Sequence, residues 1–64
     1  MMTPNEKELL EYFKEVGKAN AVTMSKKMGL SPDYTEKMCQ SLVLQKHLKK
    51  VSTAKKHPVY EIIK

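Results

Sequence analysis

Apolar residues recur every three or four positions near the start of the chain. Leu9, Phe13 and Val16, with Leu10 beside them, form a stripe, and charged residues occupy most positions between. This spacing places the apolar side chains on one face of an amphipathic helix. The pattern predicts a first helix over residues 4–16.

Two further stripes follow in the middle of the chain. Met24, Ser25 and Met28 have helical spacing and predict a second helix over residues 21–28. A third stripe of the same period predicts the longest helix, over residues 32–46. Its members are Thr35, Met38, Cys39, Leu42 and Val43.

Turn and capping residues separate these segments. Gly29 supplies the left-handed backbone that ends a helix. Ser31 and Pro32 then provide an N-cap and a first-turn proline, and Thr3 and Pro4 repeat this layout at the start of the chain. The second and third helices are therefore expected to form a helix-turn-helix.

The last part of the chain has a different pattern. Residues 48–51 and 59–63 contain β-branched and aromatic side chains and predict two strands of a hairpin. Pro58 cannot donate to a strand ladder and belongs at the start of the second strand. Lys18 and Ala19 leave room only for a bridge or a minimal strand. We expect one α+β domain over residues 1–64.

Size and composition exclude several classes of protein. A 64-residue chain has a small core and no room for an enzyme cleft beside its scaffold, so we expect no catalytic residues. No long apolar run predicts a membrane helix or a secretory signal. Cys39, His47 and His57 lack the spacing of a metal site, and the sequence predicts no metal and no cofactor. The lone cysteine favours a cytoplasmic protein.

Charge is distributed unevenly. The net charge is +5, yet residues 1–17 carry two lysines and four glutamates. Residues 46–57 contain five lysines, two histidines and no acid. This basic stretch suits a polyanionic partner, although a solvated loop is the alternative interpretation.

The predicted order of helix, short strand, helix, helix and hairpin resembles the winged-helix superfamily of small DNA-binding regulators. The most specific part of the resemblance is Met24–Pro32, M-S-K-K-M-G-L-S-P. The resemblance covers about residues 4–63. It implies a winged-helix fold whose third helix enters the major groove of duplex DNA, while the hairpin, called the wing, contacts phosphates or the minor groove.

The resemblance also implies which residues contact DNA. Gln40 could read adenine, Lys37 could donate to guanine or to a phosphate, and Glu36 could accept from cytosine. The expected DNA contacts from the third helix and its cap are Ser31, Tyr34, Lys37, Gln40 and Ser41. Those from the wing are Lys49, Lys50, Lys55, Lys56 and His57.

The chain departs from this pattern in two respects. It has no arginine, the residue that most often makes bidentate contacts with guanine and phosphate. Asp33 and Glu36 would be repelled by phosphates and can instead complement the helix dipole. The wing segment 57–60 is similar to that of Z-DNA-binding winged helices, but Glu36 and Gln40 replace the asparagine and tyrosine of that subfamily. We therefore do not expect Z-form binding.

Two functions remain open at this level. The first is a small transcription regulator that binds duplex DNA through residues 32–46 and a lysine-rich wing. The second is a winged helix that binds a protein partner or a second copy of itself, as an interaction module or accessory subunit. Leu44 bears on this choice, because it follows two apolar residues and must point away from the main stripe. It either contacts a partner or is covered by the last strand or the first helix.

Overall fold

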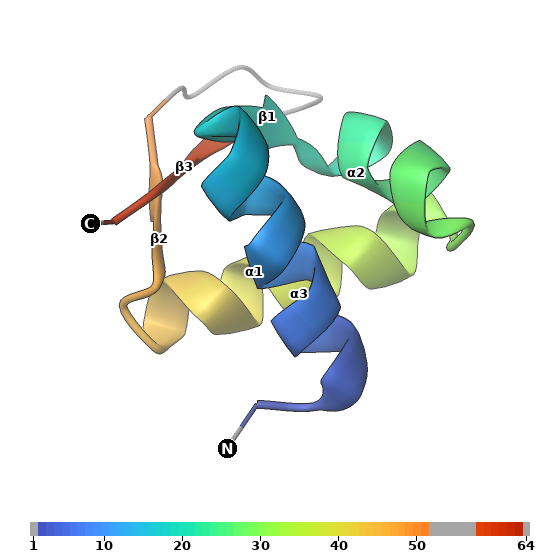
Figure 1. Cartoon of the computed structure of the whole chain (residues 1–64), viewed down its shortest axis with the longest axis horizontal. Coiled ribbons are helices and arrows are strands. Elements are labelled where there is room, and N and C mark those ends of the chain that lie inside the picture. The colour runs from blue at the N-terminus through green and yellow to red at the C-terminus, as the bar shows by residue number, and fades with distance from the viewer. Residues whose placement is uncertain (1, 52–57, 64) are drawn as a thin grey trace.

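The computed structural model of the chain describes residues 2–51 and 58–63. Within these ranges the chain forms three helices and three strands (Figure 1). The elements follow one another as α1 (Pro4–Val16), β1 (Lys18–Asn20), α2 (Ala21–Met28), α3 (Pro32–Leu44), β2 (Leu48–Lys50) and β3 (Val59–Ile62). The expected wing residues Lys55, Lys56 and His57 lie outside the described residues.

Side-chain caps fix where the helices begin. Thr3 Oγ1 accepts from the backbone N–H of Glu6 at 3.2 Å, and Glu6 Oε1 accepts from the backbone N–H of Thr3 at 2.8 Å. This reciprocal pair is a capping box. Asn20 and Ser31 cap α2 and α3, because the side-chain oxygen of each accepts from a backbone N–H three residues later. Each cap satisfies an N–H group that a helix start otherwise leaves unpaired.

Helix α3 ends at Leu44, two residues before the end that the sequence predicted. Lys46 adopts a φ of +66°, which is left-handed backbone. Its N–H donates to the carbonyl of Val43 at 3.0 Å, and the N–H of His47 donates to the carbonyl of Leu42 at 2.9 Å. These two bonds form a Schellman motif, which closes the helix. The prediction was wrong because a lysine occupies the position where glycine normally marks such an end.

Strand β3 occupies the centre of the sheet. It pairs antiparallel with β1 on one side and with β2 on the other. Tyr60 lies opposite Ala19 of β1 and Lys50 of β2. The expected minimal strand near Lys18 is therefore a third member of the sheet among the described residues, and it anchors the base of the wing to the helices.

The helices pack against one another and against the sheet around a single cluster of buried side chains. Phe13, Leu9, Met24, Leu42 and Tyr60 are large members of this cluster, and each is at most 2% exposed. Val16 was expected in the apolar stripe of α1 but is 44% exposed. It is the last residue of the helix, and the chain turns away at Gly17, whose φ is +85°.

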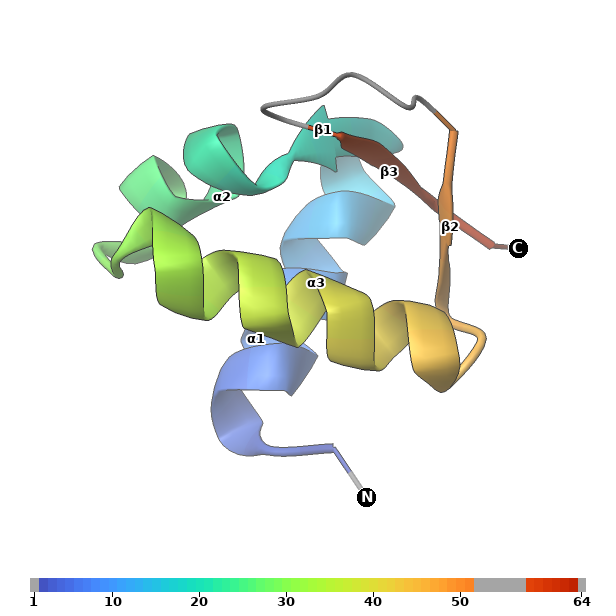
Figure 2. The same ribbon diagram turned by 180° about the vertical axis from the view of Figure 1, so that it is seen from behind.

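The architecture confirms the predicted fold class. A helix, a strand, a helix-turn-helix and two antiparallel strands follow in the order of a winged helix. Helix α3 crosses behind α1 in Figure 1 and lies in front when the molecule is turned by 180° (Figure 2). One side of α3 is thus left free of the other helices.

Candidate nucleic-acid interface

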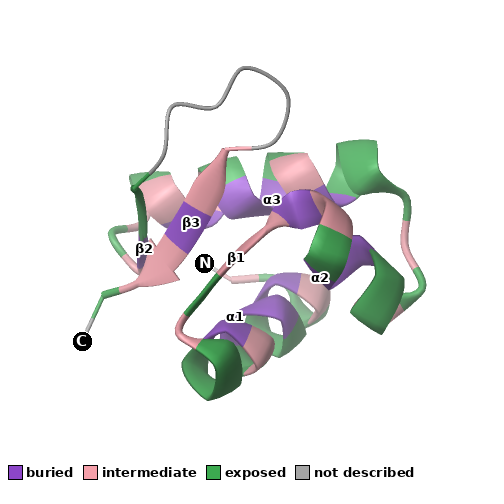
Figure 3. Ribbon diagram, turned by 90° about the horizontal axis from the view of Figure 1, so that it is seen from above, coloured by how far each residue is buried: buried purple, intermediate pink, exposed green. Residues whose placement is uncertain are grey.

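Helix α3 divides into a buried face and an exposed one. The buried face consists of Thr35, Met38, Cys39 and Leu42. The side of α3 that is turned toward the other elements carries these buried residues, and the opposite side is exposed (Figure 3). The exposed stripe, called here the outward face, consists of Asp33, Lys37, Gln40 and Leu44.

The outward face combines a cation, an amide and an apolar side chain. Lys37 and Gln40 are exposed, as a residue that contacts DNA must be. Leu44 is 84% exposed, so neither the last strand nor the first helix covers it. Asp33 lies in the first turn of α3, where its carboxylate is favoured by the positive end of the helix dipole.

A groove separates α3 from the β2–β3 hairpin. It encloses about 350 Å³ and is open to solvent. Its lining residues are Gln40, Val43, Leu44, Lys50 and Tyr60. The groove brings together Gln40 and Lys50, two expected DNA contacts that lie on different elements.

Glu36 is bonded to the sheet. The buried hydroxyl of Tyr60 donates to Glu36 Oε2 at 2.5 Å, which ties α3 to the central strand β3. Burial, and then this hydrogen bond, raise the pKa of the Tyr60 phenol above its ordinary value. The carboxylate of Glu36 is thus committed to holding the helix and the hairpin together. Sequence reasoning missed this bond, because its partners are 24 residues apart.

Two of the expected DNA contacts face α1 instead of the groove. The Tyr34 hydroxyl accepts a hydrogen bond from Asn5 Nδ2 of α1 at 3.3 Å. The Ser41 hydroxyl accepts from Gln45 Nε2 at 3.0 Å. A hydrogen bond with Ser41, and then the backbone N–H of Thr3, hold the pKa of the Glu6 carboxyl below its ordinary value. Tyr34 and Ser41 therefore lie beside the outward face and not on it.

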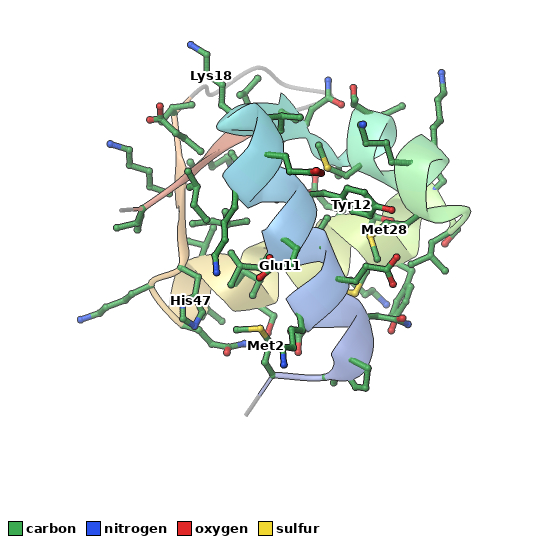
Figure 4. All side chains as sticks on the ribbon, viewed as in Figure 1. Met2, Glu11, Tyr12, Lys18, Met28 and His47 are labelled. Carbon is green, nitrogen blue, oxygen red and sulfur yellow. The ribbon has the colours of Figure 1, made fainter. Side chains whose placement is uncertain are left out.

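The two lysines of β2 point to opposite sides of the sheet. Lys50 lines the groove, whereas Lys49 lies opposite Glu61 and forms a 3.5 Å ion pair with it. Lys18 of β1 lies opposite Glu61 from the other side and extends away from the body of the molecule (Figure 4). Successive side chains of a strand point to opposite faces of the sheet. Only one of two adjacent lysines can therefore lie on the same side of the sheet as α3.

Ser31 is exposed and has a structural task of its own. Its hydroxyl accepts from the backbone N–H of Tyr34 at 3.2 Å, which caps α3. Its position at the start of α3 is also where an anion is favoured by the free N–H groups of a helix. Lys55, Lys56 and His57 of the wing remain predictions, because they lie outside the described residues.

Within the described part of the chain, no three His, Cys, Asp or Glu residues are grouped so as to hold a metal ion. Among the same residues no helix is long and apolar enough to cross a membrane. Burial, and then the Glu36 carboxylate, raise the pKa of the Cys39 thiol to about 12. The thiol is therefore neutral at pH 7 and a poor nucleophile.

The chain is similar in fold to a solved protein. It superposes on the crystal structure of a MepR-like protein complexed with pseudoligands with a TM-score of 0.84 and 23% sequence identity. The match covers 98% of this chain and 46% of that one, so the chain spans less than half the length of the MepR-like protein. No family model and no curated protein sequence matches. The likeness confirms the winged-helix fold.

Proposed function

We propose that this chain is a DNA-binding winged helix and a small transcription regulator that binds duplex DNA through α3 and its lysine-rich wing. The observation that carries this proposal is the groove between α3 and β2. There Gln40, which can read a base edge, and Lys50, which can neutralise a phosphate, line one surface.

Electrostatics supports the proposal. Lys37 on the outward face of α3 and Lys50 beside the groove are both exposed. The C-terminal part of the chain carries the excess of positive charge. Glu36 counts against the proposal, because a hydrogen bond from the neutral hydroxyl of Tyr60 does not cancel the repulsion between its carboxylate and phosphate. Lysine binds phosphate as a point charge, so the absence of arginine limits bidentate base recognition more than phosphate binding.

The fold likeness to the MepR-like protein supports a transcription regulator in general. We extend the proposal to a cytoplasmic protein that works without a cofactor and is not an enzyme. The proposed contacts are Lys37, Gln40 and Lys50, with Ser31 at a phosphate. Tyr34 and Ser41 flank this surface, and Lys49, Lys55, Lys56 and His57 add to the wing.

Salt dependence tests the proposal directly. The chain is titrated into a labelled duplex of random sequence, and binding is followed by fluorescence anisotropy at 50 and 200 mM salt. With about four to six phosphates neutralised, we expect affinity to fall by roughly two to three orders of magnitude. Absence of binding at 50 mM, or an affinity that does not change with salt, would contradict the proposal.

A matched pair of variants locates the surface. Lys50→Glu should weaken binding to all sequences and lower the log–log salt slope by at least about one. Lys14→Glu makes the same charge change on α1, where Lys14 pairs with Glu11 at 3.2 Å. Glu11 lies on the side of the molecule opposite the outward face of α3 (Figures 2 and 4). If both variants weaken binding equally, general charge and not the groove is responsible.

A protein-interaction module is the second candidate function. The observation that favours it is the 84% exposed side chain of Leu44 at the rim of a groove that also contains Val43 and Tyr60. A concentration-dependent dimer in sedimentation equilibrium that dissociates on Leu44→Ala, combined with no DNA binding at 50 mM salt, would favour this candidate.

A further inference from the structure

We propose that the outward face of α3 selects A·T base pairs, with Leu44 packing on the C5-methyl group of a thymine and Gln40 reading a nearby adenine. This inference rests on the proposed function and deepens it. It assigns a role in DNA recognition to Leu44, whose exposed side chain is not part of the buried core.

The exposure of Leu44 is the first observation. Its neighbours Leu42 and Val43 are buried and half-buried, whereas Leu44 stays 84% exposed on the stripe that also contains Lys37 and Gln40. Core packing therefore does not account for an apolar side chain at this position. A contact with an apolar group outside the chain would bury it.

Spacing is the second observation. Gln40 and Leu44 are four residues apart on one helix face, which places their Cβ atoms about 5–6 Å from each other. Bases of one strand are stacked about 3.4 Å apart. The two side chains would therefore meet base pairs that are one or two steps apart when α3 lies in the major groove.

The chemistry of the base edges favours an A·T base pair for these two side chains. Thymine presents a methyl group in the major groove, which an apolar side chain can cover without leaving a polar atom unpaired. The amide of Gln40 matches the N6 donor and N7 acceptor of adenine. The amide oxygen of Gln40 could also accept from the N4 amino group of cytosine, but cytosine offers that one group only, whereas adenine offers a donor and an acceptor and so forms two bonds. No carboxylate adds a second acceptor, because Glu36 accepts the hydroxyl of Tyr60 and Asp33 lies at the other end of α3.

The groove indicates how a duplex would be oriented on the outward face of α3. Lys50 lies across the groove from α3 and lines the same hollow as Gln40 and Leu44. A cation at this position complements a strand of phosphates that passes between helix and hairpin. A duplex held in this way would present its base edges to the outward face.

Uracil substitution tests the methyl contact. Two labelled A·T duplexes of identical sequence are compared, one with thymine and one with uracil at every such position, so that they differ only in the C5-methyl groups. We expect the unmodified chain to bind the uracil duplex about fourfold more weakly for one contacted methyl, since a buried methyl or methylene group contributes about 0.8 kcal/mol.

Variants assign the effect to the two residues. Leu44→Ala should bind both duplexes equally, and its fold should be unchanged because the side chain is exposed. Val16→Ala shortens another exposed apolar residue, on α1, and should keep the fourfold difference. Gln40→Ala should keep the thymine–uracil difference but lose preference for A·T over G·C duplexes.

The possible outcomes separate this inference from the proposed function. Salt-dependent binding with equal affinity for both duplexes would overturn the role of Leu44 and leave DNA binding intact. A thymine–uracil difference that persists in Leu44→Ala would also overturn it, because the difference would then come from the shape of the duplex. No binding to any duplex, with a dimer that Leu44→Ala disrupts, would overturn both and assign the face to a protein contact.

Discussion

Single polar residues in this chain hold pairs of elements together. Glu6 is 6% exposed although it is an acid, because it completes the cap of α1, and the Ser41 side chain of α3 helps to lower the pKa of its carboxyl. Glu36 performs a similar task between α3 and β3 through Tyr60. Each carboxylate loses contact with solvent when the chain folds, and a hydrogen-bond donor of the protein takes the place of water.

The Glu6 contacts predict a dependence of stability on pH. Its pKa in the folded chain lies below the ordinary value of 4.5, so the carboxylate stabilises the fold above that pH. The contribution is lost as the pH falls from 4.5 through the lowered pKa. Glu6→Gln should therefore be less stable than the unmodified chain at pH 7, and the difference should shrink at pH 3.

Urea unfolding at both pH values measures this effect. Glu8→Gln removes an equal charge from an exposed position of the same helix and controls for net charge. A deficit of Glu6→Gln that is as large at pH 3 as at pH 7 would show that the side chain acts by shape and not by its charge.

At the scale of elements, two helices end at a residue with left-handed backbone. Gly29 has a φ of +69° and ends α2, as its residue type predicts. Lys46 performs the corresponding task after α3 with a φ of +66°. In a lysine this backbone conformation is strained by about 1–2 kcal/mol, because the Cβ atom crowds the following carbonyl oxygen, and glycine lacks that atom.

Lys46→Gly should therefore stabilise the chain. The relief of about 1–2 kcal/mol exceeds the entropy of about 0.4–1 kcal/mol that glycine adds to the unfolded chain. We expect the free energy of unfolding to rise by about 0.5–1 kcal/mol in urea titrations. Lys37→Gly, in the middle of α3, should lower it by about 1 kcal/mol. Equal effects of the two substitutions would refute the role of the left-handed backbone.

The whole molecule depends on one small core. All the helices and the sheet contribute to the same buried cluster. A chain of this size is expected to be stable by only about 3–5 kcal/mol. The loss of one large side chain from this cluster is therefore comparable to the entire stability of the fold.

Phe13 provides the test, because it is fully buried. Phe13→Ala should cost about 3–5 kcal/mol and leave the chain largely unfolded at 25 °C, as circular dichroism would show. Val16→Ala, at the exposed end of the same helix, should stay folded. Cooperative thermal unfolding of Phe13→Ala near the wild-type midpoint would mean that stability has another source.

The sequence by itself determined the elements of this protein and their order. Caps at Thr3 and Ser31 and the spacing of apolar residues are local, and local interactions suffice to start and orient a helix. Helical periodicity predicted the helix-turn-helix, and β-branched and aromatic residues predicted the hairpin, and together they predicted the fold class. The end of α3 was predicted two residues too late, because Lys46 carries no local signal for its backbone conformation, and Val16 was wrongly placed in the buried stripe of α1.

Tertiary structure decided which expected site residues share a surface. Tyr34 and Ser41 turn to α1 because that helix crosses α3 on their side, whereas Gln40 remains free. Strand register places Lys50 in the groove and Lys49 on the opposite face. Helical and strand periods say which residues share a face, but the neighbours that cover that face come from distant segments. The physical reason is that a binding surface is what packing leaves uncovered, and packing is a property of the whole chain.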